Sequence, residues 1–244
     1  MRKQEAWKEE RKRGTSRMKG LLKFITCGSV DDGKSTLIGH ILYDSKLLYA
    51  DQEKALELDS KVGSREGKID YSLLLDGLMA EREQGITIDV AYRYFTTDNR
   101  SFIVADTPGH EDFSEDTYRT LMAADSAVMV IDASKGVEKQ TIKLFKVCVM
   151  RHIPIFTFIN KMDREANDPF ELLDEIESVL GIATCPINWP IGCGKEFKGV
   201  YDRKEKNVSL FKAAMNGQKE VDTEIVDASD EAVLKDRIGD AFYD

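Results

Sequence analysis

A glycine-rich octapeptide near the N-terminus has the residue types and the spacing of a phosphate-binding loop. It runs from Gly28 to Ser35 as Gly-Ser-Val-Asp-Asp-Gly-Lys-Ser. Glycines let backbone N–H groups converge on phosphate oxygens, Lys34 can reach the outer phosphates, and the Ser35 hydroxyl can bind Mg²⁺. An apolar run precedes the octapeptide and a helical pattern follows it, which is the setting that this motif needs. A glycine turn in front of a helix is the alternative interpretation.

Two further segments carry groups suited to a magnesium nucleotide. Asp106 ends an apolar run and can bind Mg²⁺ through a water molecule, and Gly109 can offer its amide to a γ-phosphate because it has no side chain. Thr87 can offer a hydroxyl and a carbonyl oxygen to the same ion. A capping aspartate and an ordinary strand threonine are the structural alternatives, but the order of the segments after a phosphate loop favours function.

The segment Asn160-Lys161-Met162-Asp163 supplies groups that can recognise guanine. The Asp163 carboxylate can accept hydrogen bonds from N1–H and the 2-amino group of guanine, and adenine does not present these donors. Asn160 is expected to brace the loop and contact N7, and the stem of Lys161 is expected to lie over the ring. Together with the phosphate loop, this segment predicts a GTP site.

Composition indicates an ordinary globular protein of one large or two small domains. The chain has 244 residues, of which 42% are hydrophobic and 32% charged. No apolar run approaches the ~18 residues of a membrane span, and no secretory signal is evident, so we expect no membrane partner. The four cysteines, Cys27, Cys148, Cys185 and Cys193, lack the paired spacing of a zinc site. A reduced, cytoplasmic protein is expected, with Cys27 and Cys148 buried.

Charge is unevenly distributed. The net charge is −9, but residues 1–20 contain eight basic and three acidic residues, so this arm carries +5 and the remainder −14. A basic arm can contact nucleic acid or another partner, and a solvated tail is the alternative. The acidic remainder argues against broad non-specific binding to RNA, and we expect no sequence-specific DNA partner.

Apolar runs alternate with helical patterns, which predicts an α/β fold with a mainly parallel sheet covered by helices on both faces. Strands are expected near 22–27, 127–131 and 154–159, and residues 90–95 and 101–105 form a predicted hairpin. Helices are expected from Gly136 to Met150, from Asp168-Pro169 through Leu180, and from Asp230 to Phe242. We therefore expect an N-terminal arm (1–20), a GTP-binding domain (21–182) and a small α+β accessory subdomain (183–244).

The full set of motifs resembles the GTPases of the translation-factor superfamily. Residues from about 17 to 111 resemble the GTPase subunit of ATP sulfurylase (sulfate adenylyltransferase), on residues 28–39, Tyr71–Leu78 and Glu81–Phe95. Residues from about 109 to 244 resemble peptide chain release factor 3, on residues 109–121, 160–164 and 189–201. Both families share Asp106–Glu111, so the sequence indicates a mosaic joined within that motif.

The resemblance implies roles for individual positions. His110 matches the histidine that positions the attacking water, Val30 and Ile86 match the apolar gate that fences it off, and Asp31 matches an aspartate beside a monovalent cation. The implied magnesium ligands are Ser35, Thr87 and, through water, Asp106. The implied contacts to GTP or GDP are Gly28, Asp31, Asp32, Gly33, Lys34, Ser35, Thr36, Asp106, Gly109, Asn160, Lys161 and Asp163.

Three functions follow from the two resemblances. The release factor family implies slow GTP hydrolysis stimulated by the ribosome, with recycling of class 1 termination factors. The sulfurylase family implies a regulatory GTPase whose partner is the sulfurylase catalytic subunit. The third function is guanine-nucleotide binding without catalysis.

Two departures from the families limit catalysis. The first switch, near Thr87, is of sulfurylase type, and the second, from Asp106 to Leu121, is of release-factor type. Nucleotide binding should survive this combination better than regulated turnover. Both families also continue past residue 244 with a guanine-supporting loop and the last strand and helix of the domain. We therefore expect weaker nucleotide affinity and an open sheet edge beside residues 155–159.

Overall fold

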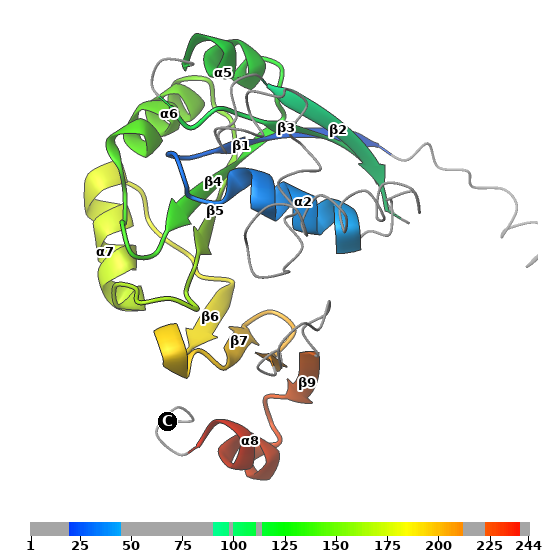
Figure 1. Cartoon of the computed structure of the whole chain (residues 1–244), viewed down its shortest axis with the longest axis vertical. Helices are drawn as coiled ribbons and strands as arrows, with labels where there is room; N and C mark the ends of the chain where they lie inside the picture. Colours follow the sequence, from blue (N-terminus) through cyan, green and yellow to red (C-terminus); the bar gives the residue numbers. More distant parts are fainter. Residues whose placement is uncertain (1–19, 45–89, 98–99, 111–113, 212–222, 240–244) are drawn as a thin grey trace, which may run out of the picture.

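The computed structural model of the chain contains two β-sheets with helices packed around them (Figure 1). It describes residues 20–44, 90–97, 100–110, 114–211 and 223–239. The first sheet consists of β1 (Leu21–Cys27), β2 (Ala91–Thr96), β3 (Ser101–Asp106), β4 (Ser126–Asp132) and β5 (Ile155–Asn160). Its helices are α2 (Lys34–Asp44), α5 (Ser114–Leu121), α6 (Lys139–Met150) and α7 (Pro169–Leu180). The second part contains β6 (Asn188–Ile191), the short 3-10 helix η3 (Gly194–Glu196), β7 (Gly199–Asp202), β8 (Asn207–Phe211), β9 (Thr223–Asp227) and α8 (Glu231–Ile238).

The first sheet is mainly parallel, as the sequence predicts. Its strands lie in the order β2-β3-β1-β4-β5, and β1 pairs in parallel with β3 and β4, as β4 does with β5. The predicted hairpin forms the antiparallel pair of β2 and β3. Parallel pairing places the carboxyl ends of β1, β3, β4 and β5 at one edge, where the last strand residues are Cys27, Asp106, Asp132 and Asn160. The predicted phosphate, magnesium and base segments therefore start from a common edge.

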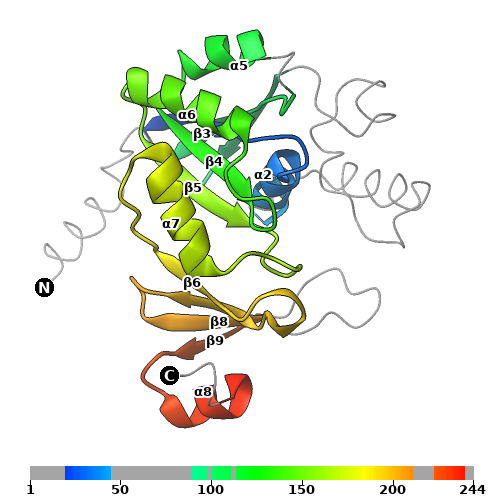
Figure 2. The ribbon, with the colours of Figure 1, turned by 90° about the vertical axis from the view of Figure 1, so that its left-hand side faces the viewer.

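Helices cover both faces of this sheet, and each face has its own apolar core. One core lies under α5, α6 and α7 and includes Leu121, Leu144 and Ile176. The other lies under α2 and contains Ile38 packed with Val104 of β3. Figure 2 shows α2 on one side of the sheet and α6 and α7 on the other. Because both faces of the sheet are covered by helices, the strands consist of apolar runs in which polar residues do not alternate with apolar ones.

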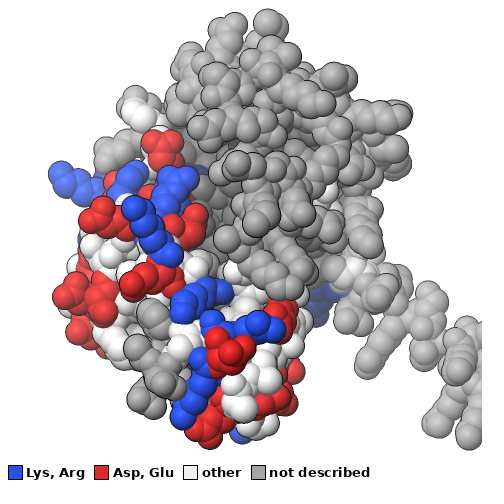
Figure 3. All heavy atoms as spheres, turned by 60° about the horizontal axis from the view of Figure 1, so that its bottom comes forward, with Lys and Arg blue, Asp and Glu red and all other residues white. Residues whose placement is uncertain are grey.

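The second sheet is antiparallel, in the order β6-β7-β8-β9, and packs its apolar side chains with Leu234 and Ile238 of α8. It is joined to the segment after β5, because the backbone N–H of Gly194 donates to the Met162 carbonyl at 2.8 Å. The rings of Phe170 and Trp189 add a contact between α7 and β6, with centroids 4.7 Å apart. Basic and acidic side chains are interspersed over the described part of the face that Figure 3 shows.

Two predicted helix boundaries were wrong. Helix α6 begins at Lys139 and not at Gly136, because Gly136 has φ 69° and its N–H donates to the Asp132 carbonyl, which closes a turn after β4. Helix α8 ends at Ile238, where Gly239 takes φ 84°. The predicted arm before Gly20 and the predictions made for residues 45–89 lie outside the described residues.

The burial of the cysteines follows the prediction. Cys27 and Cys148 are buried, whereas Cys185 and Cys193 are exposed. Across the ranges that the structure describes, we find no helix with both the length and the apolar character needed to cross a membrane.

Candidate functional site

The loop between β1 and α2 curls around its own lysine. Asp31 and Gly33 take positive φ values of 65° and 90°, and α2 begins at Lys34. The Lys34 ammonium donates to the carbonyl oxygens of Gly28 at 3.2 Å and Ser29 at 2.6 Å. Burial lowers the pKa of Lys34, and the neighbouring carboxylates of Asp106 and Asp32 act against that shift. A buried ammonium held at the N-terminus of a helix is suited to bind phosphate oxygens.

Asp106 lies fully buried beside this loop. Its Oδ1 accepts a hydrogen bond from the Thr26 hydroxyl at 3.0 Å, whereas Oδ2 is buried without a partner of good geometry. Burial is the main cause that raises the pKa of Asp106, and a hydrogen bond from Ser35 and the charge of Lys34 oppose it. An incompletely satisfied carboxylate next to a serine hydroxyl fits a magnesium ion, which prefers oxygen ligands.

Gly109 lies directly against the phosphate loop. A Cβ atom built on it would lie 2.6 Å from Lys34 Nζ and 2.7 Å from the backbone nitrogen of Val30. These distances are too short for any real side chain, so only glycine allows the two segments to approach. The backbone of Gly109 therefore lies against the Lys34 ammonium and the backbone of Ser29 and Val30.

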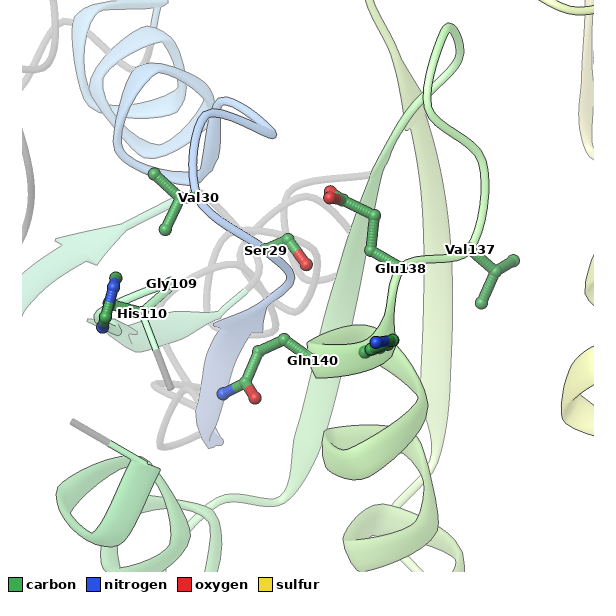
Figure 4. Close-up of a pocket in the computed structure, with 8 residues that line it drawn as sticks. Ser29, Val30, Gly109, His110, Val137, Glu138 and Gln140 are labelled. Atoms are coloured by element: carbon green, nitrogen blue, oxygen red, sulfur yellow. The ribbon is translucent and has the colours of Figure 1, made fainter. Parts of the chain in front are cut away.

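His110 lies at the rim of a pocket of about 510 Å³ between the phosphate loop and the start of α6 (Figure 4). The pocket is lined by Ser29, Val30, Gly109, His110, Val137, Glu138, Lys139 and Gln140. Val30 and His110, which the sequence predicts to act together, therefore share one cavity. The contribution of residues 137–140 is not predicted, because no motif marks the loop between β4 and α6.

The segment after β5 is fastened to the phosphate loop. The Asn160 side-chain amide donates to the Asp32 carbonyl at 2.7 Å, and a Cβ atom on Gly33 would collide with that amide. Lys161 has φ 66° and donates from Nζ to the Asp31 carbonyl. The two loops are thus connected across 128 residues of sequence. The side chain of Asp163 is exposed at the same edge of the sheet.

Asp32 lies under the loop with 1% of its surface exposed. Its Oδ2 accepts from the backbone N–H of Ser29 at 2.6 Å, and its Oδ1 has no hydrogen-bond partner. Burial raises the pKa of Asp32 to about 6, although the Ser29 hydrogen bond and the Lys34 charge act against the shift. Through its hydrogen bond from the Ser29 N–H, this buried carboxylate holds the backbone of the phosphate loop in its curled conformation.

The structure brings most of the predicted site residues to one edge. Gly28, Val30, Asp31, Asp32, Gly33, Lys34, Ser35, Thr36, Asp106, Gly109, His110, Asn160, Lys161 and Asp163 all belong to the loops and element ends described above. Thr36 lies exposed in the first turn of α2. Thr87 and Ile86 lie outside the described residues. Asp132 and Thr26, which contact Lys161 and Asp106, were missed by sequence reasoning.

Comparison with known families decides the identity of this arrangement. The family described as the elongation factor Tu GTP binding domain matches residues 19–235. The chain belongs to this family. Its members bind GTP by name, which agrees with a phosphate loop and a guanine-type segment at one sheet edge.

Relatives within the family are release factors. Peptide chain release factor 3 of Staphylococcus aureus (strain USA300 / TCH1516) is 47% identical over 232 residues, covering 90% of this chain and 43% of that protein. The Symbiobacterium thermophilum protein of the same name is 50% identical over 210 residues, covering 86% of this chain and 38% of that protein. The chain is thus a release factor 3-like GTP-binding domain that spans less than half the length of these relatives. Because the matches cover 86–90% of the chain, the prediction that the release factor resemblance is confined to residues from about 109 to 244 was wrong.

A solved structure of a Thermus thermophilus protein has the same fold. It superposes with a TM-score of 0.68 at 21% identity, covering 91% of this chain and 30% of that chain.

Proposed function

We propose that this chain is the GTP-binding and GTP-hydrolysing part of a translation termination factor of release factor 3 type. The observation that carries the proposal is the guanine-type segment fastened to a phosphate loop, in a chain 47–50% identical to release factor 3 over 86–90% of its length. The ribosome is the proposed partner, and the cytoplasm is the proposed location.

The nucleotide is proposed to lie along the edge where β1, β3 and β5 end. Backbone N–H groups of residues 28–36 and the Lys34 ammonium bind the phosphates, and Asp163 accepts from N1–H and the 2-amino group of guanine. Ser35, and Asp106 through water, hold Mg²⁺, and Thr87 is the proposed third ligand. The ion neutralises charge on the β- and γ-phosphate oxygens when it is bound. Asp31 is the proposed neighbour of a monovalent cation.

Hydrolysis is proposed to depend on His110. In phosphoryl transfer the protein contributes mainly positioning and charge stabilisation, so an imidazole that orients the attacking water is sufficient. The backbone of Gly109 lies against the Lys34 ammonium, and its amide is the proposed donor to the γ-phosphate. Val30 and Ile86 are proposed to keep His110 from the water until the ribosome moves it. Turnover of the free protein is therefore slow.

Base specificity tests the binding half of the proposal. A fluorescent GDP analogue should bind wild-type protein and be displaced by GDP and not by ADP. Asp163→Asn should lose affinity for GDP by about a hundredfold and gain affinity for XDP, because an amide can donate to the 2-oxo group of xanthine. Equal competition by ADP would contradict a guanine site.

Partner stimulation tests the catalytic half. Phosphate release from GTP should increase in the presence of ribosomes, and His110→Ala should abolish the increase while it leaves GDP affinity unchanged. Stimulation by a sulfurylase catalytic subunit instead would favour the function implied by the sulfurylase-like motifs of residues 17–111, a resemblance that rests on sequence alone. Binding without any stimulation would indicate a non-catalytic nucleotide-binding domain.

The division into an arm (1–20), a GTP-binding domain (21–182) and an accessory subdomain (183–244) remains part of the proposal. The antiparallel sheet β6-β7-β8-β9 with its own apolar core under α8 supports the second boundary. Its contacts to Met162 and α7 support a role in holding the base segment in place.

A further inference from the structure

Lys161 is held at its charged end by a residue outside the recognised motifs. Its Nζ donates to Oδ2 of Asp132 at 2.7 Å and also to the Asp31 carbonyl in the phosphate loop. Asp132 is 3% exposed, and the side chain of Lys161 is also largely buried in this ion pair. A lysine that is otherwise free to adopt many rotamers is thereby restricted to one direction, along the edge of the sheet.

The position of Asp132 follows from the register of the sheet. Asp132 is the last residue of β4, and it pairs with Asn160, the last residue of β5. Parallel pairing therefore places the Asp132 carboxylate beside the first residues of the base segment. Lys161 takes φ 66°, a left-handed conformation that is costly for a residue with a Cβ atom. The ion pair to Asp132 is a contact that can hold this conformation.

The Asp132 carboxylate is itself fixed. Its Oδ1 accepts hydrogen bonds from the Ser134 backbone N–H at 2.9 Å and from the Ser134 hydroxyl at 2.6 Å. Burial works to raise the pKa of Asp132, but the hydrogen bonds from Lys161 and Ser134 outweigh it and hold the pKa at about 2. One oxygen is thus oriented by the turn after β4, and the other remains directed at Lys161.

We infer that Asp132 is a positioning residue for guanine binding, which acts by holding the Lys161 stem where it stacks on the base. The inference rests on the proposed guanine site at Asn160–Asp163. Asp132 does not contact the nucleotide in this assignment. Its removal leaves the Lys161 ammonium with a single carbonyl partner and lets the stem and the left-handed turn relax, so bound nucleotide leaves faster.

The second sheet contains a matched control. Asp227 ends β9 as Asp132 ends β4, and its Oδ1 accepts from the Ser229 backbone N–H at 2.8 Å and the Ser229 hydroxyl at 2.6 Å. The local turn is therefore the same, but the other oxygen of Asp227 has no lysine partner among the described residues. Comparison of the two aspartates separates the effect of the ion pair from that of the turn.

The test is the dissociation rate of a fluorescent GDP analogue from Asp132→Asn, Lys161→Met and the double variant. Asp132→Asn should raise the rate about tenfold, as expected for loss of a charge-assisted hydrogen bond, whereas Asp227→Asn should leave it unchanged. In the Lys161→Met background, Asp132→Asn should have no further effect, because its partner is already absent. If Asp132 only stabilised the local structure, Asp132→Asn would raise the dissociation rate by the same factor in the wild-type and Lys161→Met backgrounds.

Three outcomes would overturn the inference. They are a wild-type rate in Asp132→Asn, an undiminished effect in the Lys161→Met background, and an equal effect of Asp227→Asn. If Asp132→Asn does not fold, Ser134→Ala replaces it, since it removes the hydroxyl that donates to Oδ1, leaves the backbone N–H as the remaining donor, and should raise the rate about threefold. Failure of the wild-type protein to bind GDP would instead refute the proposed function, and the inference with it.

Discussion

Asp32 is a buried carboxylate that is only half satisfied. One of its oxygens accepts from the Ser29 backbone, the other has no partner, and 1% of its surface is exposed. Burial raises the pKa of Asp32 to about 6, so near neutral pH the loop holds a negative charge that its surroundings disfavour. The pKa of Asp132 at the same sheet edge is shifted in the opposite direction, to about 2, because Lys161 and Ser134 donate hydrogen bonds to its carboxylate.

Asp32→Asn should change the pH dependence of stability. Because the folded-state pKa of Asp32 lies above that of the unfolded chain, its contribution to stability is present below about pH 4 and is lost as pH rises through about 6. The variant should therefore be more stable than wild type at pH 7.5, by an amount approaching about 3 kcal/mol, and the difference should shrink toward pH 4.5.

Urea unfolding of the nucleotide-free protein across this pH range measures that difference. Subtracting the variant from wild type removes the contributions of all other carboxylates. A difference between the two proteins that does not vary with pH would contradict the assignment.

Sequence reasoning predicted candidate site residues wherever a motif or a strand end marked them. Asp106 and Asn160 follow apolar runs, and the structure places both at the ends of parallel strands. The same signal was available for Asp132, which also follows an apolar strand, but no known motif includes it. Thr26 could not be found in this way, because its contact to Asp106 spans 80 residues and depends on the pairing of β1 with β3.

At the scale of elements, helix α7 shows how a local signal fixes a boundary. Asp168 caps its N-terminus by accepting from the backbone N–H groups of Phe170 and Glu171, Pro169 occupies the first turn, and Gly181 ends the helix with φ 68°. Each of these signals lies within three residues of the helix end that it marks, so the sequence predicts the helix correctly. The apolar side chains of Leu172 and Ile176 then bury one face.

Asp168→Ala should lower the free energy of unfolding by about 1 kcal/mol, because two backbone donors of α7 lose their acceptor. Asp174→Ala is the matched control, since Asp174 lies exposed in the middle of the same helix and alanine has the higher helix propensity. The midpoints of urea unfolding compare the two variants. Equal midpoints for both variants would show that the cap contributes nothing measurable.

Boundaries that depend on tertiary structure were harder to predict. Gly136 could begin a helix by sequence, but the turn after β4 uses it instead, and the helix starts three residues later. The end of α8 was placed beyond Gly239, although this glycine stops the helix. The short strands β6 to β9 were expected only as a group, because their order is set by pairing between strands rather than by local pattern.

At the scale of the whole molecule, strand β5 forms one edge of the first sheet. β5 pairs with β4, and within the described residues no other strand pairs with it. Phe156 and Phe158 project from it with 68% and 41% of their surface exposed. An uncovered strand with unpaired backbone groups and aromatic side chains is a template for association with another chain. The chain in isolation should therefore associate as its concentration rises.

Phe156→Lys should weaken this self-association about tenfold, or ~1.4 kcal/mol, because a charge on an edge strand opposes pairing with a second copy. Met150→Lys is the control, since Met150 is 69% exposed at the end of α6 and not on a strand edge. Light scattering over a range of protein concentrations measures both variants against wild type. If Met150→Lys weakens association equally, general surface hydrophobicity is responsible; if neither variant does, the open edge of β5 is not where copies of the chain meet.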